Sequence, residues 1–185
     1  MSRYVKTSYP LDEIRRHLET GPIVLVTSRW QDRTNIMTMG WHMVMQFYPA
    51  LFCCYIWEGN HSYHMIRNAR ECVINVPTVD LAEKVVAVGN STGSSLDKFA
   101  AFDLTPVTAS QVDAPLIDEC YANFECRLSD DSQIDRHGLF IWEVVEAHVA
   151  TSLKEPKTMH YRGRGEFMTA GPTIDLSESF KPQNL

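Results

Sequence analysis

Short runs of β-branched and aromatic residues recur along the chain, and such runs predict strands. The run at 23–27 reads IVLVT and predicts a buried strand, whereas the run at 139–149 alternates apolar with polar residues in its later part. Turn-forming residues separate most of the runs. We predict strands at residues 23–27, at 35–40 with an extended continuation to 47, and at 51–57, 72–76, 121–128 and 139–149.

Three stretches carry apolar residues at helical spacing. In the first, at residues 10–19, the apolar side chains share one face and Pro10 suits the first turn. Asn60 and Thr78 are placed to cap the other two helices through their side chains. We predict short helices at residues 10–19, at 61–69 and from 78 to 88.

The order of these elements indicates the fold class. Helices do not alternate regularly with the predicted strands, so a doubly wound parallel sheet is disfavoured. Many strands with three short helices favour a mainly β protein, an antiparallel barrel with helical decorations. No linker divides the chain, which predicts one domain over residues 1–185 with its core at about 10–168. The long loop at 89–115 is typical of a functional segment, and the polar stretch 171–185 is interpreted as a tail or an arm across a dimer partner.

Composition and charge narrow the possible partners. The chain has 185 residues and a formal net charge of −6, without a run of Lys or Arg, which disfavours nucleic acid and an anionic membrane surface. No apolar stretch approaches the roughly 20 residues of a membrane span. No secretory signal is visible, so we expect a cytoplasmic protein. The five cysteines form no C-x-x-C pair, which favours free thiols over disulfides or a zinc site.

Two segments carry residue types suited to a ligand. Residues 89–99 (GNSTGSSLDKF) offer N–H and O–H donors with one cation, as a phosphate requires. Residues 35–41 (NIMTMGW) form a strand-like run whose flat, partly apolar surface suits an aromatic ring. Together they indicate a ligand with a phosphate at one end and a planar ring at the other. Each segment also has an ordinary interpretation, as a surface loop and as a core strand.

Several common sites are not supported by the residues. The 89–99 loop lacks Walker A spacing, and 163–165 (GRG) lacks the context of a Rossmann turn. No carboxylate pair and no G-x-S-x-G elbow are visible. His61 and Ser62 could meet a phosphate at the start of a helix. His61 and His64 share a helix face, but no neighbouring Asp, Glu or Cys completes a metal site, and two surface histidines are the simpler interpretation.

The order of these segments resembles the flavin reductase-like family of FMN-binding split barrels, and within it the flavoredoxin-type members. The resemblance covers roughly residues 10–168 and rests on the order of the motifs rather than on any single one. The matching segments are 21–27 (GPIVLVT), 35–41, Cys54-Tyr55, 61–63 (HSY), 73–77 (VINVP), 91–99 with DKF at its end, 112–117 (VDAPLI), Glu125-Cys126 and 161–163 (YRG).

The resemblance implies a Greek-key split β-barrel that forms a homodimer, with FMN in a cleft near the subunit interface. FMN would supply the chemistry at its N5 atom, so no catalytic side chain and no metal are expected. Lys98 would serve either the phosphate or the ring near N1 and C2=O. The residues implied at the ring are Asn35, Met37, Thr38, Met39, Trp41, Cys54, Tyr55 and Phe167. Those implied at the phosphate and ribityl end are Ser62, Ser91, Thr92, Gly93 and Lys98, and nicotinamide contacts are expected at His160 and Arg162.

Three functions are compatible with this resemblance. The first is an FMN-binding oxidoreductase that transfers reducing equivalents from NAD(P)H to flavin. The second is a flavoredoxin-like electron carrier between redox protein partners, because no dinucleotide motif is visible. The third is a split-barrel binding module without turnover.

Overall fold

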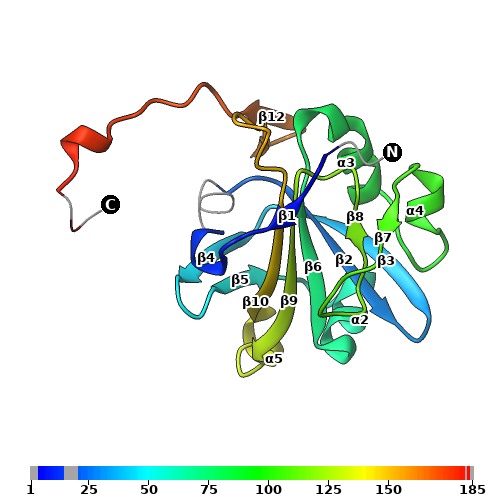
Figure 1. The fold of residues 1–185 in the computed structure, drawn as a ribbon. Helices are drawn as coiled ribbons and strands as arrows, with labels where there is room; N and C mark the ends of the chain where they lie inside the picture. The colour runs from blue at the N-terminus through cyan, green and yellow to red at the C-terminus, as the bar shows by residue number, and fades with distance from the viewer. Residues whose placement is uncertain (1–3, 15–20, 182, 184–185) are drawn as a thin grey trace.

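The computed structural model describes residues 4–14, 21–181 and 183. It is a mainly β structure built on one antiparallel sheet of eight strands, with the order β3-β2-β6-β9-β10-β5-β4 and β1 paired to β10 (Figure 1). Two small sheets, β11-β12 and β7-β8, complete it. The strands are β1 (Thr7–Ser8), β2 (Val24–Trp30), β3 (Arg33–Met39), β4 (His42–Gln46), β5 (Leu51–Tyr55), β6 (Glu71–Val76), β7 (Pro106–Val107), β8 (Leu116–Ile117), β9 (Ala122–Asp130), β10 (Leu139–Val149), β11 (Met159–Gly163) and β12 (Glu166–Thr169). The helices are η1 (Leu11–Glu13), α2 (His61–Ala69), η2 (Val79–Leu81), α3 (Ala82–Gly89), α4 (Lys98–Ala101), α5 (Ile134–His137) and η3 (Ser177–Ser179).

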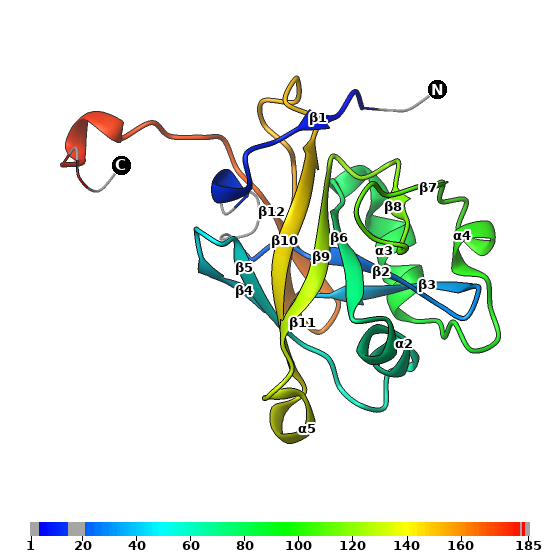
Figure 2. The same cartoon turned by 60° about the horizontal axis from the view of Figure 1, so that its bottom comes forward.

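The sheet is strongly twisted, and β2 and β3 run across the direction of β9 and β10 (Figure 2). The two ends of the strand order, β3 and β4, are consecutive in the chain and are joined by Gly40 and Trp41. The concave side encloses the main core, whose largest fully buried side chains include Trp142, Phe52 and Phe140. The barrel is therefore filled by side chains, and ligand space lies at its rim.

Strand β2 is buried on both faces, as its apolar run predicts. Val24 and Val26 belong to the main core, whereas Leu25 belongs to a second cluster. The second cluster also contains Val85 of α3 and Phe99 of α4, and both helices pack against β3. Burial of such side chains contributes about 1.5–3 kcal/mol each. This packing holds the loop between α3 and α4 beside β3.

Most predicted elements are present, with shifted bounds. The predicted strands correspond to β2 to β6, β9 and β10, and helix 61–69 corresponds to α2. The expected extension of the second strand to residue 47 is corrected, because the chain breaks at Gly40 and continues as a separate strand, β4. The side-chain caps predicted for Asn60 and Thr78 are not formed, although both residues stand at N-cap positions. Of the predicted helix 10–19, the structure has η1, and residues 15–20 lie outside the described residues.

Several short elements differ from the sequence prediction. The segment 89–115 is not one loop, because it contains α4 and β7. Asp97 caps α4 by accepting hydrogen bonds from the backbone N–H groups of Phe99 and Ala100. The hairpin β11-β12 was not predicted from the sequence. Its strands are only five and four residues long and mostly exposed, so they lack the long apolar run that marks the central strands.

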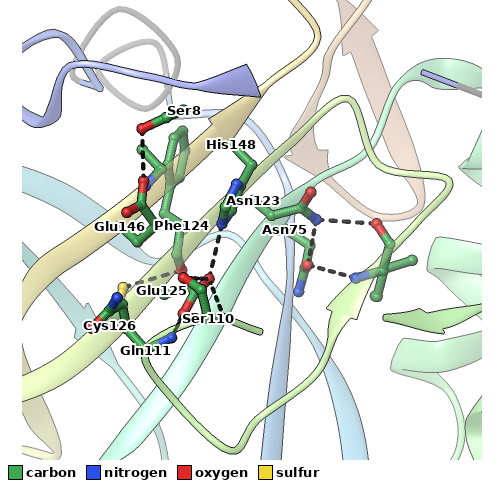
Figure 3. Close-up of polar contacts among 12 residues, drawn as sticks. Ser8, Asn75, Ser110, Gln111, Asn123, Phe124, Glu125, Cys126, Glu146 and His148 are labelled. Carbon is green, nitrogen blue, oxygen red and sulfur yellow. Dashed lines mark hydrogen bonds and ion pairs between the residues drawn. The ribbon is translucent and has the colours of Figure 1, made fainter. Parts of the chain in front are cut away.

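A buried polar network fixes the segment between α4 and β9 against the sheet (Figure 3). Glu125 of β9 accepts hydrogen bonds from the N–H groups of Ser110 and Gln111 and from the Ser110 hydroxyl, and it pairs with His148 at 2.9 Å. Burial alone would raise the pKa of Glu125, but these hydrogen bonds outweigh it and hold the pKa below the ordinary value. The segment is thus anchored by a carboxylate that must stay ionised.

The chain after β12 leads away from the barrel (Figure 1). Residues 171–181 are exposed, and they include the apolar side chains of Ile174, Leu176 and Phe180. The part of the chain that the structure describes contains no helix that is both long and apolar enough to cross a membrane.

Candidate functional site

A small cavity lies where β3, the start of α2 and the α3–α4 loop meet, and we call it the loop cavity. Its volume is about 210 Å³. It brings together eight of the residues that the sequence predicts at a ligand, although they come from segments up to 63 positions apart (35 to 98). These eight are Asn35, Met37, Thr38, Ser62, Ser91, Thr92, Gly93 and Lys98, and the other lining residues are Gly59, Asn60, His61, Val88 and Gly89.

The floor of the loop cavity is polar. Asn35 is only 2% exposed, and its Nδ2 donates to the Ser62 hydroxyl at 2.7 Å. Its Oδ1 atom has no hydrogen-bond partner among the described residues. A Cβ at Gly93 would overlap with Asn35 Oδ1, so only glycine lets the loop approach this closely. The buried oxygen is an acceptor ready for a ligand hydroxyl.

Lys98 is 5% exposed and holds two segments together. Its Nζ atom donates to the carbonyl oxygens of Ile36 in β3 and Val88 in α3, both at 2.9 Å. Burial lowers the pKa of this amine. An ammonium group carries three N–H donors, so one remains for a ligand in the loop cavity.

Two further basic side chains gather around this cavity. Arg33 donates from Nη2 to the carbonyl oxygens of Gly93 and Ser94, both at 3.3 Å. His61 is the first residue of α2, where backbone N–H groups lack helical partners. Burial first, and then the charges of Arg33, Lys98 and His64, lower the pKa of His61. The cavity is therefore electropositive.

The sequence prediction did not include Arg33 in the site, although a signal for it exists. Arg33 and Asn35 are two residues apart in β3, so their side chains lie on the same face of the strand. The sequence prediction reached position 35 and stopped there, because residues 31–34 looked like a turn. The structure places the turn at Gln31 and Asp32, which have positive φ angles of 49° and 61°.

A second cavity, the hairpin cavity, lies beside the first, and Thr38 and Gly89 line both. Its volume is about 530 Å³. The Tyr161 and Phe167 rings, 5.0 Å apart across the β11-β12 hairpin, line it together with Trp41. The remaining lining residues are Gly21, Ile23, Gly40, Val85, Val86, Asn90 and Gly165. Three aromatic rings and several small residues make this cavity suitable for a flat ring.

Some sequence-predicted side chains lie elsewhere. Met39 and Cys54 are buried in the main core, and Trp142 donates from Nε1 to Cys54 Sγ at 3.3 Å. Neither residue lines either cavity. Tyr55 lines neither cavity, but its ring contacts that of Trp41 at 5.4 Å.

The residues expected at a nicotinamide are also displaced. His160 is buried and its Nε2 atom lies 3.1 Å from the Thr158 hydroxyl. Because neighbours in a strand point to opposite faces, Tyr161 is the residue that lines the hairpin cavity. Arg162 is exposed and lines neither cavity. Of these neighbouring residues in β11, only Tyr161 lines the hairpin cavity.

Comparisons with known proteins agree with this architecture. The chain is 24% identical to an FMN-binding domain of a flavin reductases-like enzyme from Shewanella baltica, with a TM-score of 0.87 and coverage of 93% of this chain and 97% of that one. It is also 24% identical to flavoredoxin of Desulfovibrio vulgaris, with a TM-score of 0.77 and coverage of 86% and 91%. At these identities the likeness shows the fold, a split β-barrel.

Sequence comparisons extend the relationship. An uncharacterized protein of Archaeoglobus fulgidus is 30% identical over 158 residues, which is 82% of this chain and 86% of that protein. The protein YddH of Escherichia coli is 28% identical over 188 residues, covering 94% and 98% of the two chains. Residues 15–168 match the family described as "Flavin reductase like domain". The chain therefore belongs to the flavin reductase-like family.

Proposed function

We propose that this chain is an FMN-binding oxidoreductase that transfers reducing equivalents from NAD(P)H to flavin. The observation that carries the proposal is the pair of adjoining cavities, one electropositive and polar, the other aromatic. Because Thr38 and Gly89 line both cavities, one ligand can extend from the first into the second. FMN has the matching layout, with a phosphate, a polyhydroxyl chain and a planar ring in that order.

The loop cavity fits the phosphate and ribityl end. The free N–H groups at the start of α2, the Thr92 hydroxyl and the remaining N–H of Lys98 are donors, whereas the Ser91 hydroxyl already donates to the Val88 carbonyl at 3.1 Å. The unpartnered Oδ1 of Asn35 complements them as an acceptor for a ribityl hydroxyl. The site thus provides donors for the phosphate and an acceptor for the chain that follows it.

The hairpin cavity fits the ring. Phe167 and Tyr161, in the β11-β12 hairpin, offer flat apolar faces. Trp41 lines the cavity from the connection between β3 and β4. Thr38 donates its hydroxyl hydrogen to the Val85 carbonyl at 2.7 Å, which fixes its side chain where the two cavities meet. Trp41 is 72% exposed in the single chain and borders this side of the cavity.

When bound, FMN supplies the redox chemistry, because its N5 atom can accept a hydride. The chain then has to bind the phosphate, orient the ring and leave one face accessible. This division of roles explains why a site without a catalytic acid–base pair is sufficient.

The exposed face of β4 supports a homodimer. β4 is at one end of the strand order and exposes the apolar side chains of Met43 and Met45. This face continues into Trp41, which lines the hairpin cavity. A second copy of the chain on this face would cover apolar surface and border the ring site. The exposed segment 171–181 is long enough to serve as an arm across that partner.

An absorption spectrum of the purified full-length chain, loaded with FMN, tests the function. We expect a yellow protein that bleaches when NADH or NADPH is added without oxygen and regains its colour in air. Colour without bleaching by either nucleotide would reject the NAD(P)H oxidoreductase and leave flavin binding intact. A chain that stays colourless and gains no thermal stability from FMN would reject both.

A flavoredoxin-like electron carrier is the second candidate. It is favoured by the positions of His160, which is buried, and Arg162, which lines neither cavity, because these were the expected nicotinamide contacts. Slow reduction by NAD(P)H beside fast reduction by a reduced ferredoxin-type protein would support this role. Rapid, saturable oxidation of NADH would reject it.

A further inference from the structure

We propose that His61 is a ligand of the FMN phosphate and takes up a proton when the phosphate enters the loop cavity. The inference rests on the proposed FMN binding and adds to it a specific phosphate ligand and a dependence on pH. Its basis is the position of His61 and the charges around it. A further basis is that the neighbouring cations already donate hydrogen bonds to backbone carbonyls.

His61 is placed for this role by α2. It lines the loop cavity as the first residue of a helix of 9 residues, beside the buried Ser62. The described residues form no hydrogen bond to its imidazole. At the same place the buried Asn35 Oδ1 lacks a partner, which marks the cavity as a ligand site independently of the helix end.

The charges that act on His61 are all positive. Arg33 of β3, Lys98 of α4 and His64 of α2 each act on it electrostatically. The residues that line the cavity include no Asp and no Glu. Burial first, and then these charges, lower the pKa of His61, which favours the neutral imidazole before a ligand binds.

A phosphate monoester reverses this balance, because it brings a charge of about −1.5 to −2 at pH 7. Lys98 donates two of its hydrogens to backbone carbonyls, and Arg33 donates to Gly93 and Ser94. Both cations are therefore partly committed, whereas the His61 imidazole is free to add a proton and donate to the phosphate. The proton comes from solvent and remains on the ring while FMN is bound.

The direction of the pH effect follows from linkage. The pKa of His61 is lower in the free protein than in the complex, so between the two values each binding event takes up a proton. FMN affinity then falls as the pH rises through the pKa of the complex. The FMN phosphate itself gains a proton near pH 6, which acts in the opposite direction and is common to all variants. Comparing variants at each pH isolates the contribution of His61.

The test uses the full-length chain freed of flavin and measures the binding of FMN and of riboflavin, which lacks the phosphate, by flavin fluorescence. We expect His61→Gln to weaken FMN binding about tenfold near pH 6.5 and only about twofold near pH 8.5. Riboflavin binding should not change. His137→Gln, at an exposed histidine of α5 that lines neither cavity, is the matched control and should keep wild-type affinity for both ligands. His61→Lys carries a permanent charge, so its FMN affinity should exceed that of His61→Gln at both pH values.

Calorimetry in two buffers of different ionisation enthalpy provides the second measurement, proton uptake on FMN binding. Uptake should be present in the wild type and in His137→Gln, and it should be lost in His61→Gln. If His61→Gln retains wild-type FMN affinity or proton uptake, the inference fails while FMN binding stands. Equal loss of riboflavin and FMN binding would also overturn it, because the role of His61 would then be structural. If the wild type binds neither flavin, the proposed function fails as well.

Discussion

The Oδ1 atom of Asn35 lies where the side chain of residue 93 would begin, so Asn35 and Gly93 are in direct contact. The contact ties the α3–α4 loop to β3 at the floor of the loop cavity. The amide is held in place from its other end by the hydrogen bond from Nδ2 to Ser62. One small residue in the loop therefore decides how closely three segments approach.

Gly93→Ala should displace either the loop or the Asn35 amide, because the added methyl group overlaps with Oδ1. We expect FMN affinity to fall about tenfold and thermal stability to decrease. Isothermal titration calorimetry and thermal unfolding measure the two effects. Gly171→Ala is the control, since a Cβ at Gly171 meets nothing within 4 Å and should change neither. Wild-type FMN affinity in Gly93→Ala would remove this contact from the site.

Lys98→Ala should weaken both FMN retention and folding. The buried ammonium group donates to Ile36 and Val88, and a hydrogen bond involving a charged group contributes about 1.5–3 kcal/mol. Lys84→Ala is the control, because Lys84 also donates to a backbone carbonyl, that of Asp103, but near the surface. Chemical unfolding and FMN titration separate the two effects. Loss of stability with unchanged FMN affinity would place Lys98 outside the phosphate site.

Phe167→Ala should weaken FMN and riboflavin binding to the same extent, because the ring of Phe167 lines the cavity proposed for the flavin ring. Aromatic contacts contribute about 0.5–1.5 kcal/mol, which corresponds to roughly twofold to thirteenfold in affinity. Met168→Ala changes the adjacent residue, which lines neither cavity, and should bind as the wild type does. Fluorescence titration with both flavins measures the effect, and a loss confined to FMN would contradict it.

Met43→Glu should dissociate the proposed homodimer and lower FMN retention. Met43 is 59% exposed on β4, and a carboxylate there would be costly to bury against a second copy. Analytical ultracentrifugation gives the mass, and absorbance gives the flavin content. Val107→Glu changes an exposed apolar residue on β7, away from β4 (Figure 2), and should alter neither. A Met43→Glu dimer with a full complement of FMN would show that this face is not the interface.

Glu125 should make the protein sensitive to acid. Its pKa in the folded state lies below the ordinary value of 4.5, so its contribution to stability is complete above that pH. The contribution is lost as the pH falls through 4.5 and then through the lower folded-state pKa. Glu125→Gln should lower the free energy of unfolding at pH 7 by about 2–4 kcal/mol and flatten its decline in acid. Urea unfolding at several pH values measures this.

Glu146→Gln is the control for that experiment, because Glu146 accepts an exposed hydrogen bond from Ser8 on a neighbouring part of the same sheet (Figure 3). We expect it to change stability little at any pH. Equal acid sensitivity in Glu125→Gln and the wild type would show that other carboxylates dominate acid unfolding.

Elements with a strong local pattern were predictable. The apolar run of β2 and the helical spacing of α2 appear in the sequence because both elements bury a continuous apolar surface. The hairpin β11-β12 was not predictable in this way, because its strands are only five and four residues long and bury little apolar surface. α4 is only four residues long, and the capping by Asp97 rather than a hydrophobic period defines it.

The candidate site shows the same division. The small and hydroxyl residues of the 89–99 loop indicated a phosphate, and eight predicted residues line the loop cavity. Met39, Cys54 and His160 are buried and line neither cavity, because a strand alternates its faces and the sequence does not reveal which face is inward. Arg33 was missed because the turn before β3 is shorter than its sequence suggests.

By itself, the sequence determined the β-rich class, the order of the motifs and the kinds of group available to a ligand, since these depend on local composition and spacing. Only the tertiary structure decided that Lys98 spans β3 and α3, that Arg33 and His61 stand beside it, and that Tyr161 rather than His160 lines the hairpin cavity. The physical reason is that these relationships arise from strand register and from helices packing on the sheet. Such contacts join residues far apart in the chain, and no local pattern encodes their direction.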